Sequence, residues 1–308
     1  MNFGAVIERN SSFSSLPMDG PALEAMLARE RCLIFHNFDA SVEEFEQISN
    51  AVSDDFHTYR GGGFTVGKLS RAVVNDNKTL MTATGTTQDF PMPLHGEMYY
   101  LGGPPDLIWF YCQVPVQSGG QTTIGDGVQI FRDLPAETQT LLRHRNIRYD
   151  RRIPDGDWQI TFQAETREEA EAFCRNQKME LSWNEDGSAQ TQFRTSALRE
   201  TASGDFSFIN SMELLALGEM AMRASGGEKL ASEIKINLVV RWEDGTPIEP
   251  EILKQIARAT SRNEVEVSWQ RGDIILVDNR SVMHGRRGSS GSDRKILVRM
   301  GNLRSAQA

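Results

Sequence analysis

The sequence predicts a mainly β fold with helices around it. Short runs rich in aromatic and β-branched residues form two blocks, at about 92–131 and at 264–300, with glycine- and proline-containing turns between the runs. Segments with helical spacing lie before and between these blocks. Because the blocks are far apart along the chain, we expect a barrel or a sandwich that pairs early strands with late strands.

The first part of the chain predicts two helices with a buried strand between them. Residues 21–38, PALEAMLARERCLIFHNF, have the pattern of a short helix followed by a strand. Ser41 and Glu44 have the spacing of a capping box, so a second helix is expected to begin there and to run through FEQISNAV. The glycine-rich stretch 59–71 lacks the strand and helix that flank a nucleotide-binding loop, and we interpret it as a loop or hairpin near a site.

The early β block contains three predicted strands. They are HGEMYYL at 95–101, DLIWFYCQVP at 106–115 and QTTIGDG at 121–127. Helices are predicted at 125–145 and at 165–177, since apolar residues recur there at helical spacing.

The end of the chain predicts one more helix and the late β block. A strand in 236–248 ends at an Asp244-Gly245 turn, and Pro250 suits the first turn of a helix through residue 260. The late strands are expected in EVEVSWQ, DIILVDN and RKILVRM; the first alternates polar and apolar residues and the other two have the apolar runs of buried strands.

Composition favours a protein of the cytoplasm that acts on small molecules. Lys and Arg number 33 against 42 Asp and Glu, and the net charge of −9 argues against nucleic acid or an anionic membrane as partner. Cys32, Cys112 and Cys174 are odd in number and lack metal-binding spacing, which is typical of a reducing compartment. We find no signal-peptide pattern at the N-terminus and no apolar run of about 18 residues, so no membrane span is expected.

Two histidines and one glutamate are the candidate metal ligands. His95 and Glu97 are two positions apart, and in an extended strand such residues point to the same side. His284 follows the buried run DIILVDN. Two imidazoles and one carboxylate bind one face of an octahedral metal and leave the other face open, as in non-haem Fe(II) oxygenases. The alternative is a half-exposed strand with two polar residues; His36, His57 and His144 we interpret as structural or solvated.

Two arginines near the C-terminus are candidates for binding a 2-oxoacid co-substrate. A guanidinium binds a carboxylate through two hydrogen bonds and stays charged in an apolar pocket. Arg294 and Arg299 are five positions apart, so in a regular strand at most one of them points inward. We interpret Arg286 and Arg287 as part of a solvated basic loop.

Three further polar residues have two interpretations each. Thr122 either donates its hydroxyl proton to the same carboxylate or simply packs as a β-branched strand residue. Asp278 and Asn279 precede the distal histidine and are expected to orient either the turn or a metal ligand.

These motifs together resemble the TauD/TfdA superfamily of Fe(II)/2-oxoglutarate-dependent oxygenases, especially its clavaminate synthase-like branch. The resemblance covers about residues 20–302 and is most specific in PLHGEMYY, in PPDLIWFYC with SGGQTTIGDG, and in WQRGDIILVDNRSVMHGRRG with GSDRKILVRM. It implies a double-stranded β-helix (jelly-roll) core with helices outside. It also implies a single domain over 1–308, with a helix-containing insertion at about 150–235.

The resemblance assigns roles to individual residues. It implies three iron ligands, His95, Glu97 and His284. Thr122 and Arg294 match the residues that bind 2-oxoglutarate in the family. Many relatives have two arginines four positions apart, so the spacing of five leaves an alternative in which Lys295 takes the first position and Arg299 the second, facing the substrate.

The function expected from this resemblance is that of a non-haem iron dioxygenase. With Fe(II), 2-oxoglutarate and O2 it would hydroxylate or desaturate a small molecule, such as an amino acid or a natural-product intermediate, and release succinate and CO2. Two alternatives stay open: a non-redox metal-dependent hydrolase or isomerase, and a catalytically silent binding module on the same barrel. The sequence identifies neither the substrate nor the oligomeric state.

Overall fold

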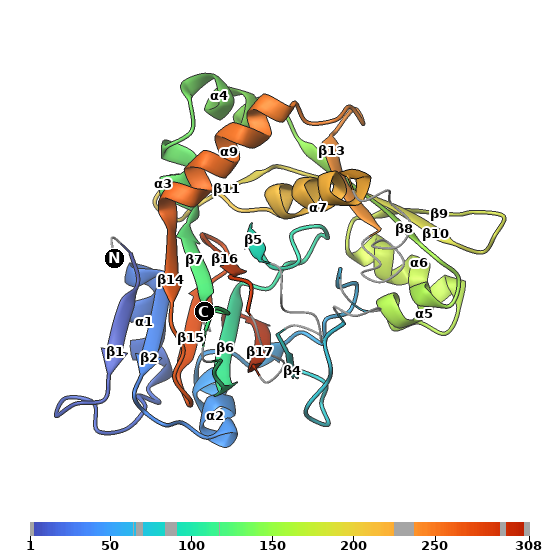
Figure 1. Ribbon diagram of the computed structural model, residues 1–308. Coiled ribbons are helices and arrows are strands. Elements are labelled where there is room, and N and C mark those ends of the chain that lie inside the picture. Colours follow the sequence, from blue (N-terminus) through green and yellow to red (C-terminus); the bar gives the residue numbers. More distant parts are fainter. Residues whose placement is uncertain are drawn as a thin grey trace.

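The computed structural model describes residues 3–63, 65, 70–83, 91–116, 118–224, 237–289 and 294–304. Strands dominate its centre and helices cover the outside (Figure 1), which confirms the predicted mainly β architecture with helices. The described helices are α1 (Gly20–Glu30), α2 (Val42–Val52), α3 (Gly127–Arg132), α4 (Ala136–His144), α5 (Asp157–Phe162), α6 (Arg167–Asn176), α7 (Met212–Ala224) and α9 (Pro250–Asn263).

The largest sheet has seven strands in the order β1-β2-β15-β6-β17-β3, with β4 paired to β17. Its strands are β1 (Ala5–Glu8), β2 (Cys32–His36), β15 (Ile274–Asp278), β6 (Leu107–Val114), β17 (Lys295–Asn302), β3 (Asp55–Phe56) and β4 (Leu80–Thr82). One face of this sheet packs against α1 and α2 through a cluster that includes Leu23, Phe45 and Trp109. Because β6 is hydrogen-bonded between β15 and β17, the structure confirms that early and late strands pair.

The second sheet has four strands in the order β14-β7-β16-β5. They are β14 (Glu264–Val267), β7 (Thr122–Asp126), β16 (Val282–Arg286) and β5 (Met92–His95). Its apolar side chains, among them Ile124 and Val282, meet Ile34, Phe110 and Val298 of the first sheet in one core cluster. The two sheets therefore form a sandwich, and in the described residues neither closes into a barrel.

A third sheet lies in the middle of the chain, to one side of the sandwich together with α5 and α6 (Figure 1). Its order is β13-β8-β10-β9, and a separate hairpin joins β11 to β12. These strands are β8 (Ile147–Ile153), β9 (Glu180–Trp183), β10 (Ala189–Thr195), β11 (Leu198–Glu200), β12 (Phe206–Phe208) and β13 (Leu238–Trp242). The segment at about 150–235, predicted to contain helices, thus contains both helices and strands of a separate sheet.

Several local signals produce the elements that they predict. Ser41 Oγ accepts a hydrogen bond from the Glu44 N–H at 3.1 Å and Glu44 Oε2 accepts one from the Ser41 N–H at 2.8 Å, so the capping box of α2 is complete. Pro250 is the first residue of α9. Gly245 has a φ of 87°, which turns the chain after β13. The three cysteines are free and buried. In the described residues no helix is long and apolar enough to cross a membrane.

Candidate metal centre

The second sheet places the two candidate histidines opposite each other. His95 is the last residue of β5 and His284 lies in the middle of β16, and the antiparallel register pairs these two residues directly. Their ring centroids are 4.4 Å apart, and both side chains are buried. Two residues distant in sequence thus become neighbours because β16 is hydrogen-bonded to β5 on one side and to β7 on the other.

Glu97 reaches this pair from a turn and not from the predicted strand. The strand ends at His95, and Met98 has a left-handed φ of 60°, so the prediction of one extended strand through HGEMYYL is wrong. The backbone N–H of Gly96 bonds to the Asn210 carbonyl at 2.8 Å and that of Glu97 bonds to Asn279 Oδ1 at 2.9 Å. These hydrogen bonds stand in place of the predicted strand pairing, so Glu97 approaches the imidazoles from a turn.

Asn279 fixes the backbone of Glu97 on both sides. Its Oδ1 accepts from the Glu97 N–H, and its Nδ2 donates to the carbonyls of Glu97 at 3.1 Å and of Pro105 at 2.8 Å. The side chain is buried, so these bonds are not shared with solvent. Asp278, by contrast, accepts from the side chain and backbone of Arg280 and orients the turn after β15. Of the two residues before the distal histidine, Asn279 is therefore the one that positions a candidate ligand.

Replacing Asn279 by alanine is expected to lower metal affinity by about 10- to 100-fold. The change frees the Glu97 backbone and leaves its buried N–H without an acceptor. Calorimetric titration with Zn(II) measures the effect, with Asp278→Asn as the control because Asp278 contacts Arg280 instead. A folded Asn279→Ala variant with unchanged metal affinity would contradict this role.

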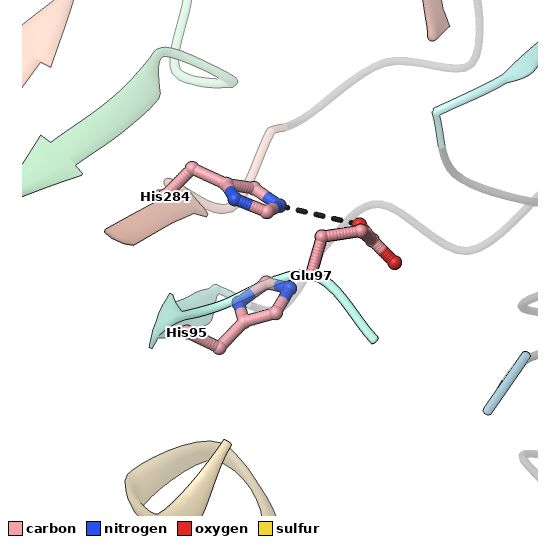
Figure 2. Close-up of side chains that lie close together, drawn as sticks. All are labelled: His95, Glu97 and His284. Atoms are coloured by element: carbon pink, nitrogen blue, oxygen red, sulfur yellow. Dashed lines mark ion pairs between the residues drawn. The ribbon is translucent and has the colours of Figure 1, made fainter. Parts of the chain in front are cut away.

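The three side chains fit a divalent metal. One ligand atom from each of His95, Glu97 and His284 lies within 4.8 Å of the others, and the side chains converge in Figure 2. His95 Nδ1 lies 2.9 Å from the Pro93 carbonyl, so this nitrogen carries the proton and Nε2 keeps its lone pair for a metal. In the described surroundings His284 Nδ1 has no hydrogen-bond partner, while His284 Nε2 lies 3.5 Å from Glu97 Oε2. Two nitrogens and one carboxylate are the donor set of a facial iron site.

The protonation states of the ligands also suit a metal. Burial and the neighbouring His284 lower the pKa of His95 to about 3, so its ring is neutral at physiological pH. Burial alone would raise the pKa of Glu97, but Arg71 and the two imidazoles hold it well below its ordinary value. A metal would thus meet His95 and Glu97 in forms that need not lose a proton first.

Arg71 is a site residue that the sequence reasoning missed. Its Nη2 donates to Glu97 Oε2 at 2.8 Å, and its side chain is only 8% exposed. Its guanidinium lies 4.2 Å from the centre of the Tyr59 ring. Arg71 stands just after the glycine-rich stretch, in no recognisable motif, and the only signal for it would have been that stretch itself.

One pocket joins the two candidate histidines to Thr122 and Arg294, two of the predicted co-substrate residues. Its lining residues are Arg71, Ala83, Met92, His95, Phe110, Thr122, His284, Gly285, Arg286 and Arg294. Thr122 Oγ accepts a hydrogen bond from Trp269 Nε1 at 3.1 Å, and Arg294 Nε donates to the Gly120 carbonyl at 2.9 Å. Burial and the nearby Arg286 lower the pKa of Arg294 to about 10, which still leaves it charged at neutral pH.

Arg299, in β17, points toward α2 and not into this pocket. Its Nη1 donates to Ser49 Oγ at 2.6 Å and to Asn50 Oδ1 at 2.8 Å, and its guanidinium stacks on Phe56 at 3.5 Å. These contacts tie the sheet to α2, and Arg299 is absent from the lining of the pocket described above. The structure therefore separates the two arginines, as their odd spacing predicts.

Arg286 is buried, and its interpretation as part of a solvated loop is wrong. It is the last residue of β16, it pairs with Thr122 across the sheet, and it is 4% exposed. The rule that residues two apart share a face, applied to His284, would have placed it beside the metal pocket. Arg287 points outward and pairs with Glu264 and Glu266, both at 2.7 Å, as expected of a surface residue.

Sequence comparison agrees with this geometry. A profile of the taurine catabolism dioxygenase TauD, TfdA family matches residues 2–300. The chain belongs to this family. It is accordingly a non-haem iron, 2-oxoglutarate-dependent dioxygenase that uses Fe(II), 2-oxoglutarate and O2, as the predicted reaction class requires.

Individual relatives are distant but extend over most of the chain. The dapdiamide synthesis protein DdaC from Enterobacter agglomerans is 24% identical over 294 residues, which span 93% of this chain and 85% of DdaC. A clavaminate synthase-like protein from Arabidopsis thaliana is 26% identical over 279 residues, 86% of this chain and 80% of that protein.

Solved structures share the fold at lower identity. A putative α-ketoglutarate-dependent taurine dioxygenase from Burkholderia xenovorans superimposes with a TM-score of 0.58 at 13% identity, over 97% of this chain and 88% of that one. The PvcB protein from Pseudomonas aeruginosa gives a TM-score of 0.55 at 15% identity, over 97% and 85% of the two chains.

Proposed function

We propose that this dioxygenase hydroxylates or desaturates a small molecule, such as an amino acid or a natural-product intermediate, with release of succinate and CO2. His95, Glu97 and His284 would hold the iron. The observation that carries the proposal is the grouping of these three buried side chains, two of which, His95 and His284, line one pocket with a buried arginine, Arg294. Because the set binds one face of a metal, the opposite face stays free for the co-substrate and O2.

Arg294 and Thr122 are the proposed binding residues for 2-oxoglutarate. Arg294 offers a charged guanidinium inside the pocket, where the distal carboxylate of a 2-oxoacid needs a counter-charge. Thr122 already accepts a hydrogen bond from Trp269, so its own hydroxyl proton is available for the same carboxylate. Arg299 is left out of this proposal because it contacts α2.

The residues around the metal would shape the reaction more than they perform it. With iron and 2-oxoglutarate bound, O2 would be the oxidant that breaks a C–H bond of the substrate, and 2-oxoglutarate would supply two further electrons as it becomes succinate and CO2. Phe110 packs beside His284, with ring centroids 5.2 Å apart, and helps to exclude water. Asn279 holds the backbone of Glu97, and in the metal-free protein Arg71 holds its side chain.

We interpret the two facing sheets as the halves of a jelly-roll core within a single domain over 1–308. The residues at about 150–235 would be an insertion beside that core, with a role in substrate choice. DdaC is a dapdiamide synthesis protein, and PvcB is an Fe, α-ketoglutarate dependent oxygenase from an isonitrile synthetic pathway; both favour a natural-product substrate here. The free, buried cysteines suit a cytoplasmic location.

Anaerobic protein with Fe(II) and 2-oxoglutarate is expected to develop the weak visible charge-transfer band of the chelate. A panel of amino acids and natural-product intermediates, scored by succinate release in air, then tests for a substrate. Boiled protein and protein with Zn(II) in place of iron serve as controls. A spectrum without the band, in protein that binds the metal, would count against the proposal.

A further inference from the structure

We propose that Arg71 couples metal binding to the binding of an acidic substrate. In the metal-free protein Arg71 pairs with Glu97; once a metal takes up the charge of Glu97, Arg71 binds a carboxylate of the substrate. The inference rests on the proposed function and adds the chemical class of the substrate, a small molecule with a carboxylate group.

Arg71 is a buried cation with a single acidic partner in the described part of the chain. Its Nη2 donates to Glu97 Oε2 at 2.8 Å and its Nη1 to the Met300 sulfur at 3.6 Å, a weak acceptor. Its guanidinium stacks over Tyr59. Because a buried guanidinium without a counter-charge is costly, its stability in this place depends on Glu97.

The oxygen that Arg71 holds is also the oxygen that faces a candidate metal ligand. Glu97 Oε2 lies 2.8 Å from Arg71 Nη2 and 3.5 Å from His284 Nε2. A divalent cation bound between the imidazoles and this carboxylate would become the largest local charge and would draw on the same oxygen. Arg71 would then have lost much of its counter-charge while still lining the pocket.

A second buried cation, Arg151, contacts the loop that carries Tyr59. Arg151, on β8, is 5% exposed and donates to two neutral oxygens, Asn237 Oδ1 and the Gly61 carbonyl, both at 3.1 Å. Gly61 belongs to the same loop as Tyr59, whose ring lies under the Arg71 guanidinium, so both guanidinium groups contact this loop. Arg71 forms its ion pair with Glu97, whereas Asp157 is the acidic group that acts on Arg151.

This charge pattern selects an anion distinct from the co-substrate. The distal carboxylate of 2-oxoglutarate is assigned to Arg294, which contacts the Gly120 carbonyl. Arg71 lies beside Glu97 and Tyr59 instead, and a planar guanidinium in that position binds a carboxylate through two hydrogen bonds. A neutral substrate would leave Arg71 without this partner.

The test measures Arg71-dependent binding of a simple carboxylate. Phenylacetate and its neutral match, phenylacetamide, are titrated by saturation-transfer NMR into protein with saturating 2-oxoglutarate, with and without Zn(II). With Zn(II) we expect phenylacetate to bind at least about tenfold more tightly than the amide, and Arg71→Gln to remove this preference. Without metal, Arg71→Gln should change phenylacetate binding little, because Glu97 then occupies Arg71.

Two results would overturn the inference: a carboxylate preference that survives in Arg71→Gln, or an Arg71-dependent preference of equal size without metal. Arg71→Lys keeps the charge and should retain part of the preference, which gives a second reading if Arg71→Gln does not fold. Arg152→Gln, next to Arg151 on β8 but exposed and paired with Asp186, is the matched control and should bind like the wild type.

The visible band of the Fe(II)–2-oxoglutarate complex separates this inference from the proposed function. If the wild type lacks the band, the proposed function fails. If wild type and Arg71→Gln both show it but carboxylate preference is absent, only the role of Arg71 fails. If Arg71→Gln alone loses the band, Arg71 serves to position Glu97, and the coupling to substrate is rejected.

Discussion

Alanine in place of Glu97 is expected to abolish substrate-coupled succinate formation and to lower metal affinity by at least about 100-fold. Glu97 is the only carboxylate in the buried three-residue ligand group, so its loss leaves two imidazoles. The change also removes the acidic partner of Arg71. Leaving that guanidinium buried and unpaired should destabilise the metal-free protein by about 3–5 kcal/mol.

Two kinds of measurement distinguish the loss of metal binding from the loss of stability. Zn(II) titration and the anaerobic Fe(II)–2-oxoglutarate band report the metal site, and urea unfolding of the metal-free protein reports stability. Glu97→Gln is the shape-matched control: it keeps an oxygen for Arg71 but removes the charge, so it should lose metal affinity with less loss of stability. Normal coupled turnover in Glu97→Ala would remove Glu97 from the metal.

The two candidate histidines could be located from the sequence because its apolar pattern predicts strands around them. His95 lies in β5, at the start of an aromatic-rich block, and His284 follows a continuous apolar run that becomes β15. His95 ends β5, and His284 lies in β16, the strand that follows β15. The route of Glu97 was not predictable, because its turn depends on hydrogen bonds to Asn210 and Asn279, which are far away in the sequence.

Residues whose roles depend on tertiary contacts could not be predicted from the sequence. Arg71 reaches Glu97 from a segment without periodicity, so no pattern marks it as buried. Arg286 follows a glycine and precedes another arginine, which reads as a polar loop until the pairing with Thr122 shows that β16 continues. The third sheet was hidden for a related reason: buried positions of its strands hold polar residues, such as Arg151 in β8 and Thr191 in β10, which conceal the apolar alternation.

The sequence left open whether Arg294 or Arg299 binds 2-oxoglutarate. Arg294 lines the metal pocket and Arg299 contacts α2, so one variant of each tests the question. Arg294→Ala is expected to weaken 2-oxoglutarate binding by about 100-fold or more, because a buried carboxylate would lose its charged partner. The iron ligands are untouched, so metal affinity should stay within a few-fold. The midpoint of the anaerobic charge-transfer band in a 2-oxoglutarate titration measures the change.

Arg299→Ala is the matched comparison, on the same segment but with its side chain on the other face. It loses the bonds to Ser49 and Asn50 and the stacking on Phe56, so the melting temperature should fall while 2-oxoglutarate affinity is kept. The reverse outcome, weak co-substrate binding in Arg299→Ala and normal binding in Arg294→Ala, would exchange the two assignments. Since Arg294 lines the metal pocket and Arg299 contacts α2, one titration of both variants decides which of the two arginines binds the co-substrate.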